Sequence, residues 1–391
     1  MTDRERLLRE ALKEVRADDE QAAEDRAWRV VAAASPSGPA RPARRRHRWR
    51  AAQAAVALAL IALVVSPAGA SVRHWVADRI DEPGVPHAQP VLSSLPGDGS
   101  LLVDSAQGPW VVHPDGSKRL LGDWAEASWS PHGLYAVVSD GHELAAVEPD
   151  GKVRWTLTRP GQVGLARWNG PDGFRIAFLE GHDLRVVDGD GSDQRRIAGG
   201  AAAVAPAWRP GPAHVLAYAT RRGAVVARNA DSGREVFATA SGPRILSLQW
   251  GAAGLLVTRP DLVQLLDATG RPLRSWTPPP GARFRSATAA PGGRRVAVVI
   301  EAGRNDRALL LAKSHPSHVL FAGPGDFGAP RWSPDGHWLL LPWPSADQWL
   351  FLHPGGGTAK LHAVAKVAKQ FSPGQSSGAR FPSVTGWCCT R

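Results

Sequence analysis

The chain has 391 residues, of which 43% are hydrophobic and 21% charged, so it is too apolar to be disordered. Its 41 Gly and 33 Pro disfavour an all-helical bundle, and its two cysteines exclude a scaffold of several disulfides. The net charge of +11 is unevenly placed, since residues 41–50 carry six arginines and no acid. Because this run precedes an apolar segment, it indicates a membrane boundary rather than nucleic-acid binding.

Residues 1–35 are predicted to form a cytoplasmic segment with one helix, which opens on the capping-box pattern Thr2-Asp3-Arg4-Glu5. Its apolar stripe is discontinuous. The helix is therefore either a charged lead into the next segment or a docking element for a cytoplasmic partner. Residues 36–50 follow as a Pro- and Arg-rich juxtamembrane linker.

Residues 51–72 carry no charge and are long enough to cross a ~30 Å hydrocarbon core as a helix. Arginines precede this segment and acids follow it, so we expect a cytoplasmic N-terminus and an extracytoplasmic remainder, which begins with a linker at 73–89. An uncleaved anchor is the leading interpretation. Cleavage at Ala68-Gly69-Ala70 and a buried helix of a soluble protein are the alternatives. The membrane-flanking residues are Arg44, Arg45, Arg46, Arg48 and Arg50.

From residue 90 to residue 391 the sequence repeats with a period near 40 residues. A typical copy has a tryptophan, a turn rich in Ser, Pro, Asp and Gly, and short apolar runs separated by polar turns. Four short strands in about 40 residues are typical of a propeller blade. We predict an all-β propeller, with seven blades favoured and six or eight as alternatives. The copies begin near 94, 129, 168, 208, 250, 289 and 332, and a fragment from 371 is expected to complete the first or last blade.

The turn is expected to follow the innermost strand of each blade, and the tryptophan ring to pack against the next blade. The tryptophan is missing from the copies near 94 and 289. The predicted blade-motif residues are Trp129, Pro131, Gly133, Trp168, Asp172, Gly173, Trp208, Pro210, Trp250, Trp332, Pro334, Asp335 and Gly336.

The copies at 129–160 and 332–353 carry Trp-Ser-Pro-His-Gly and Trp-Ser-Pro-Asp-Gly. They resemble the WD40-like (PD40) repeat found in the C-terminal propeller of TolB and in the propellers of prolyl oligopeptidase relatives. The resemblance covers about 90–391 and implies a ring of six to eight blades with a protein-binding surface. In the enzymes of that family a separate hydrolase domain carries the activity.

Three motifs match patterns known from catalytic or ligand-binding sites, but none has the surrounding sequence that such a site requires. The G-x-S-x-G match at 374–378 has no surrounding strand-turn-helix and no following His to act as base. The G-x-G-x-x-G match at 323–328 leads into a strand, and the acidic run at 188–193 suits a hairpin turn better than a calcium loop. We therefore expect no catalytic residue, no cofactor and no metal.

Cys388 and Cys389 are adjacent and lie outside the membrane if the predicted topology holds. A vicinal disulfide, a bond between molecules and two buried free thiols are all compatible with the sequence.

The leading hypothesis is a membrane-anchored, non-enzymatic propeller that binds a protein or glycan outside the cytoplasm, without a role for nucleic acid. An anti-sigma-like transmembrane regulator with a propeller sensor is the alternative, although residues 1–50 lack the zinc-binding motif of that class. A propeller hydrolase is the third hypothesis.

Overall fold

The computed structural model describes residues 92–170, 174–311, 318–355, 360–372 and 379–389. All of them belong to one compact unit, Trp75–Arg391. The predicted cytoplasmic helix, the juxtamembrane linker, the membrane anchor and the linker that follows it lie outside the described residues. Within the described part of the chain, no helix has the length and hydropathy needed to span a membrane.

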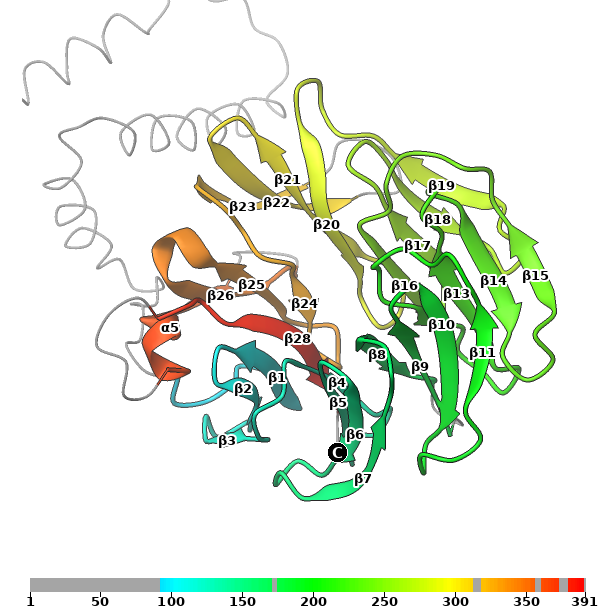
Figure 1. The fold of residues 1–391 in the computed structure, drawn as a ribbon. Helices are drawn as coiled ribbons and strands as arrows, with labels where there is room; N and C mark the ends of the chain where they lie inside the picture. The colour runs from blue at the N-terminus through cyan, green and yellow to red at the C-terminus, as the bar shows by residue number, and fades with distance from the viewer. Residues whose placement is uncertain (1–91, 171–173, 312–317, 356–359, 373–378, 390–391) are drawn as a thin grey trace, which may run out of the picture. The chain divides into compact units, whose positions relative to one another are not determined.

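Seven antiparallel sheets of four strands make up the described residues (Figure 1). We number these sheets as blades in chain order. Blade 1 is β28 (Ser383–Cys388), β1 (Ser100–Ser105), β2 (Gly108–Val112) and β3 (Lys118–Leu120); blade 2 is β4 (Glu126–Trp129), β5 (Ala136–Asp140), β6 (Glu143–Val147) and β7 (Val153–Thr158); blade 3 is β8 (Val163–Trp168), β9 (Arg175–Glu180), β10 (Asp183–Asp188) and β11 (Arg195–Ala198).

The remaining four blades are each built from consecutive strands. Blade 4 is β12 (Ala207–Trp208), β13 (Val215–Ala219), β14 (Val225–Asn229) and β15 (Glu235–Ala238); blade 5 is β16 (Ser247–Gly251), β17 (Gly254–Thr258), β18 (Val263–Leu266) and β19 (Pro272–Trp276); blade 6 is β20 (Arg283–Ala289), β21 (Val296–Ala302), β22 (Asn305–Leu311) and β23 (His318–Pro324); blade 7 is β24 (Arg331–Trp332), β25 (Leu339–Trp343), β26 (Gln348–His353) and β27 (Lys360–Ala365).

The first strand of each blade touches the first strand of the next. These contacts run from β4 through β8, β12, β16 and β20 to β24, and β28 touches both β24 and β4. The strands therefore form a closed ring, and the described chain is a seven-bladed β-propeller. The prediction of an all-β propeller with seven blades is confirmed.

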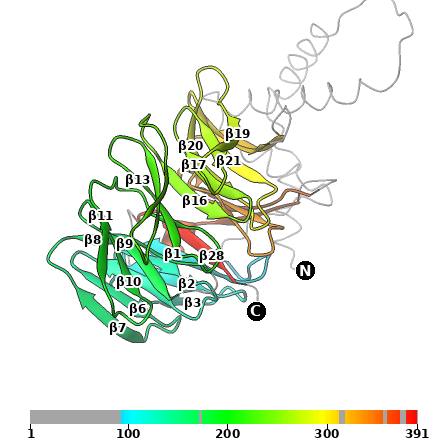
Figure 2. The ribbon, with the colours of Figure 1, turned by 90° about the vertical axis from the view of Figure 1, so that its right-hand side faces the viewer.

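Blade 1 is completed by the C-terminal strand. β28 pairs antiparallel with β1, with Trp387 opposite Leu101, and the two strands lie side by side in two perpendicular views (Figures 1 and 2). The expectation that the terminal fragment closes the ring is confirmed. The strand begins at Ser383, however, and not in the Phe371 region where the repeat pattern placed the fragment.

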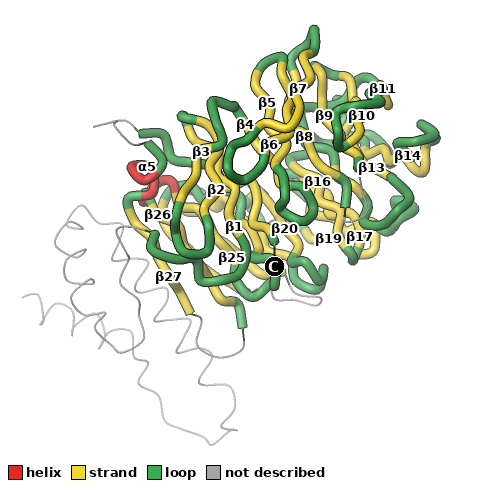
Figure 3. The backbone as a smooth tube through the Cα atoms, turned by 90° about the horizontal axis from the view of Figure 1, so that it is seen from below, coloured by secondary structure: helices red, strands yellow, loops and turns green. Residues whose placement is uncertain are grey.

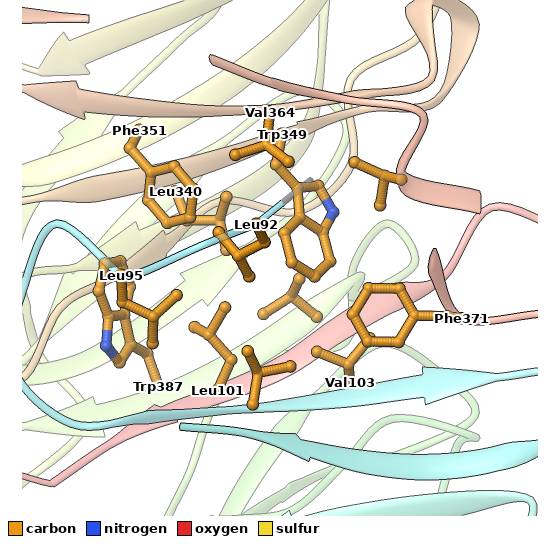
Figure 4. Close-up of a cluster of buried hydrophobic side chains, with 13 residues drawn as sticks. Leu92, Leu95, Leu101, Val103, Leu340, Trp349, Phe351, Val364, Phe371 and Trp387 are labelled. Atoms are coloured by element: carbon orange, nitrogen blue, oxygen red, sulfur yellow. The ribbon is translucent and has the colours of Figure 1, made fainter. Parts of the chain in front are cut away.

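A buried apolar cluster joins blade 7 to blade 1 (Figure 4). Phe371 follows the short helix α5 (Val367–Gln370), which lies beside β26, and its ring is 5.2 Å from the ring of Trp349 (Figure 3). Phe371 is therefore a core residue and not the start of another blade. The labelled residues of the cluster are Leu92, Leu95, Leu101, Val103, Leu340, Trp349, Phe351, Val364, Phe371 and Trp387.

The repeat tryptophans pack against the preceding blade. Trp208 lies in a cluster with blade 3 side chains, and its Nε1 donates to the carbonyl of Arg167 at 2.8 Å. Trp332 donates in the same way to the carbonyl of Thr288 in blade 6. The prediction of packing against the next blade is wrong. Alternate side chains of a strand point to opposite faces of the sheet, and the tryptophans lie on the face that packs against the preceding blade.

The copy near 94 obtains its tryptophan from the other end of the chain. Trp387 on β28 donates its Nε1–H to the carbonyl of Asp98 at 2.9 Å, within the turn that leads into β1. In blade 6, Ala289 ends the first strand at the position that tryptophan holds elsewhere. One of the two missing tryptophans is thus present in space, about 290 residues away in the sequence.

The Ser-Pro turns close in the same way in different blades. The amide of Gly133 donates to the carbonyl of Ser130 at 3.0 Å, and that of Gly336 donates to the carbonyl of Ser333 at 2.8 Å. Both glycines have positive φ, 66° and 70°, which a residue with a side chain rarely adopts. The glycine of the motif is therefore required by the backbone of the turn.

Candidate functional site

Two cavities flank the turn at 130–135, which joins β4 to β5. One lies between blades 1 and 2 and holds the two cysteines, and we call it the disulfide cavity. The other lies between blades 2 and 3, and we call it the apolar cleft. His132 at the tip of the turn lines both of them, so the two cavities are neighbours on one face of the propeller.

The disulfide cavity has a volume of about 350 Å³ and a lining of mixed polarity. Cys388 and Cys389 form a vicinal disulfide in its wall, and both residues are half-buried. The sulfur of Cys389 lies 3.3 Å from the carbonyl oxygen of Pro131, in the turn of blade 2. Of the three alternatives that the sequence left open, the structure contains the vicinal disulfide.

The apolar cleft is larger, about 610 Å³, and most of its surface is apolar. Leu134 and Phe174 stand at its opening with 64% and 74% of their surfaces exposed. Trp155 and Trp168 form part of the lining, and Tyr135 lies beside them. Exposed apolar side chains of this size at one opening form a surface that can bury apolar groups of a partner.

Two glycines of blade 3 hold the tryptophans of the cleft in place. The Nε1 of Trp155 donates to the carbonyl of Gly189 at 2.8 Å. A Cβ atom on Gly189 would come within 2.9 Å of the Trp168 ring, and one on Gly191 within 3.0 Å of the Trp155 ring. The glycines of the acidic run at 188–193 therefore let both rings lie close against the backbone of this turn.

Two charged side chains beside the cleft already have partners. Asp190 accepts hydrogen bonds from the amide and the hydroxyl of Ser192, at 3.0 and 2.6 Å, and the hydroxyl bond is the main reason that its pKa is lowered. Arg154 forms an ion pair with Glu148. Within the described residues no group of three His, Cys, Asp or Glu side chains is placed to hold a metal ion. The acidic run is thus a hairpin turn between β10 and β11.

The predicted blade-motif residues are spread around the ring and do not converge on one site. Trp129 lines the disulfide cavity, and Trp168 lines the apolar cleft. The tryptophans lie at or near the ends of the innermost strands, and the described Pro, Asp and Gly residues lie in the turns that follow. Those described are Trp129, Pro131, Gly133, Trp168, Trp208, Pro210, Trp250, Trp332, Pro334, Asp335 and Gly336; Asp172, Gly173, Arg44, Arg45, Arg46, Arg48 and Arg50 lie outside the described residues.

Sequence reasoning did not single out Leu134 and Phe174. Both come directly after the glycine of a Trp-turn motif, in two successive repeats. At the same position the sixth repeat has Arg294 and the seventh has His337. A large apolar residue after the turn glycine is not needed for the blade, so this pair is a signal for a surface site that the sequence does contain.

No protein-family model matches the chain, and no curated protein sequence matches it. Among solved structures, Hsv2 of Kluyvelomyces marxianus is similar, with 8% identity and a TM-score of 0.51, over 68% of this chain and 93% of that chain. The likeness is one of fold alone. The Cps50 (Swd1) β-propeller domain of Myceliophteria thermophila matches over 62% of this chain and 86% of its own, with 14% identity and a TM-score of 0.49. A chain of the mitotic checkpoint complex matches over 61% and 79%, with 17% identity and a TM-score of 0.49.

Proposed function

We propose that this protein is a non-enzymatic binding propeller that recognises a protein partner through the apolar cleft. The observation that carries the proposal is the pair of exposed apolar side chains, Leu134 and Phe174, at the opening of a cleft lined by Trp155 and Trp168. Interface centres are enriched in aromatic side chains and surrounded by polar groups, as this cleft is. We favour a protein over a glycan, because most of the cleft surface is apolar and two large apolar side chains stand at its opening.

We further propose that the propeller is of the PD40 type and that residues 51–72 anchor it in a membrane, with the propeller outside the cytoplasm. The charge distribution around 51–72 supports this topology. The disulfide between Cys388 and Cys389 also supports it, since such bonds persist mainly in oxidising compartments.

The partner site is tested by photo-crosslinking from the cleft. A photoreactive amino acid at Leu134 in the full chain, within its native membrane, is expected to crosslink one defined protein. The same amino acid at Leu273, which is 54% exposed on β19, serves as the control. The affinity of that protein for the purified full chain is then measured.

Leu134→Ser and Phe174→Ser are each expected to weaken this affinity about tenfold or more, since burying one such side chain contributes about 1.5–3 kcal/mol. Leu273→Ser should leave it unchanged. All three side chains are exposed, so the thermal midpoints of the variants should stay close to that of the wild type. An affinity that does not respond to either cleft variant would exclude the cleft as the binding site.

The topology is tested with single cysteines introduced into a Cys388→Ser/Cys389→Ser background. A membrane-impermeant maleimide applied to intact cells should label a cysteine at Ala106, which is exposed in the turn between β1 and β2, but not one at Ser35. Labelling at Ser35 and protection at Ala106 would place the propeller in the cytoplasm and refute this part of the proposal.

A further inference from the structure

The vicinal disulfide does not link separate parts of the fold. Cys388 and Cys389 are the only cysteines of the chain and are neighbours in the sequence. The stability that a disulfide adds grows with the length of the loop that it closes, and this bond encloses no intervening residue. β28 is held in blade 1 independently of the bond, by its pairing with β1 and by the buried ring of Trp387. Stability of the fold therefore does not explain two cysteines at this place.

The disulfide is accessible to small reactants. It lies in the wall of the disulfide cavity, whose volume of about 350 Å³ is large enough to admit a small thiol. Both cysteines are half-buried rather than enclosed. Exposed disulfides are commonly the labile and regulatory ones, whereas structural disulfides resist reduction. The position of this bond is thus typical of a redox-active group.

The backbone of the two cysteines is fixed from the side of blade 1. A Cβ atom on Gly99, which has a φ of 88°, would lie 2.7 Å from the carbonyl oxygen of Cys388 and 2.9 Å from the backbone nitrogen of Cys389. Cys388 also pairs with Ser100 at the start of β1. A change at the sulfur atoms must therefore be accommodated on their other side, where the cavity and the turn between β4 and β5 lie.

On that side the sulfur atoms lie directly against the turn between β4 and β5. The Sγ of Cys389 is 3.3 Å from the carbonyl oxygen of Pro131, and the Sγ of Cys388 is 3.8 Å from that of Ser130. A Cβ atom on Gly133 would lie 3.4 Å from the Sγ of Cys389. The disulfide is thus in van der Waals contact with the backbone of this turn, so the turn is sensitive to the state of the two sulfurs.

The same turn carries a residue of the proposed partner site. The amide of Ser130 donates to the carbonyl of Tyr135 at 2.8 Å, and the amide of Tyr135 donates to the hydroxyl of Ser130 at 3.0 Å. These bonds tie the two ends of the turn together, so it moves as a unit. Leu134, which stands at the opening of the apolar cleft, follows Gly133 within this unit. A displacement of the turn by the sulfurs therefore also displaces Leu134.

We propose that the disulfide between Cys388 and Cys389 is a redox switch that sets the affinity of the apolar cleft for its partner. The inference rests on the proposed function, whose regulation it describes. The reductant is a dithiol. One of its thiolates attacks a sulfur of the disulfide, and the electron pair of the S–S bond leaves on the other cysteine, which takes up a proton. The second thiolate of the reductant then displaces the first cysteine, so the reductant becomes a disulfide and its two protons end on the two cysteine thiols.

Reduction changes the contact between the cysteines and the turn. Two thiols need more room than a disulfide, because sulfur atoms that are no longer bonded repel each other at bonding distance. The thiols also gain S–H donors, and the carbonyl of Ser130 beside them already accepts from the amide of Gly133 at 3.0 Å. Crowding and this competition are expected to loosen the turn and to move Leu134 at the opening that it shares with Phe174. Couplings between two sites typically change an affinity by about 5- to 150-fold, so reduction should weaken partner binding about fivefold or more.

Hydrogen exchange of the full chain, before and after treatment with dithiothreitol, tests the switch without the partner. Mass spectrometry should find two alkylated thiols after the treatment, with an unchanged circular dichroism spectrum. Amides in the turn at 130–135 should then exchange about threefold faster or more. The turn at 333–338 is the matched control and should not respond. Its glycine amide donates to the carbonyl of Ser333 in the same way, at 2.8 Å, whereas both cysteines lie against the other turn.

Equal exchange at 130–135 in the oxidised and reduced protein would overturn the proposal. Free thiols in protein isolated without a reductant would also overturn it, because the switch requires the disulfide as its resting state.

The affinity of the crosslinked partner for the oxidised and the reduced full chain tests the link to the cleft. Reduction should weaken it about fivefold or more for the wild type, and dithiothreitol should have no effect on the affinity of Cys388→Ser/Cys389→Ser. An affinity that falls with Leu134→Ser but not with reduction would refute the switch and keep the cleft as the binding site. An affinity that responds to neither would refute the proposed function, and the regulation of the cleft with it.

Discussion

Replacing Trp387 with alanine tests whether the C-terminal strand is an integral part of blade 1. The indole is only 8% exposed, lies 5.7 Å from the ring of Phe351 in a T-shaped arrangement, and donates a hydrogen bond to Asp98. Truncating a buried tryptophan costs about 3–5 kcal/mol, of which the lost hydrogen bond accounts for about 1 kcal/mol. We therefore expect Trp387→Ala to lower the free energy of unfolding by about 3–5 kcal/mol.

Trp208 provides the matched control, because it holds the equivalent place in blade 4. It is 6% exposed, and its indole donates to the carbonyl of Arg167. Urea unfolding of the full chain, followed by fluorescence and circular dichroism, should show losses for Trp387→Ala and Trp208→Ala that agree within about 1 kcal/mol. A loss below about 1 kcal/mol for Trp387→Ala, with the full loss for Trp208→Ala, would show that the ring holds without β28.

Three further predictions concern the backbone, the pH dependence and the disulfide. Gly254 has a φ of 133°, and a Cβ there would lie 2.3 Å from a carbonyl oxygen, so Gly254→Ala should cost about 3 kcal/mol or more by thermal unfolding. Gly141→Ala, with a φ of 55° and open space, should cost about 1 kcal/mol. Burial raises the pKa of Asp104 to about 7, so between about pH 4 and pH 7 the folded state retains a proton that the unfolded state releases. The free energy of unfolding should therefore fall as the pH rises through this range. The urea midpoint should fall less for Asp104→Asn than for the wild type. Because Cys388 and Cys389 are adjacent, reduction should change stability by about 1 kcal/mol or less, and mass spectrometry should detect two alkylated thiols after reduction and none before.

The number of blades was predictable because every blade is built from the same local structural features. A tight turn after the innermost strand requires a glycine with positive φ, and the space between blades requires a large apolar ring, so the Trp-turn signature recurs once per blade. The copies near 94 and 289 lack the tryptophan, but they keep the spacing of about 40 residues and could therefore be counted as blades.

The closing strand was misplaced for a physical reason. The repeat signature joins a tryptophan to the turn that follows it, and in blade 1 these two parts belong to opposite ends of the chain. Trp387 is followed by two cysteines rather than by a Ser-Pro turn, and its turn partner includes Asp98. Residues 371–374 match the repeat signature better than the segment around Trp387 does, but in the structure Phe371 is a core side chain beside α5.

The apolar cleft depends on a relation between blades that spacing does not encode. The apolar cleft arises because Leu134 and Phe174, from two adjacent blades, line the same opening, and their exposure follows only from the folded surface. The repeat pattern also does not specify which face of the innermost strand carries the tryptophan, so it does not show whether the ring packs against the preceding or the next blade.

Closure by β28 imposes an order on the biogenesis of the protein. The hydrogen bonds of this strand reach residues 283 to 289 positions earlier, so blade 1 cannot be finished until synthesis has passed β28. Until then the inner edge of β1 carries unpaired backbone groups, which are prone to pairing with other strands. Correct folding of the propeller therefore requires that this edge stays free of other strands during translation, and a chain that stops before Ser383 would have six intact blades and one open, aggregation-prone edge.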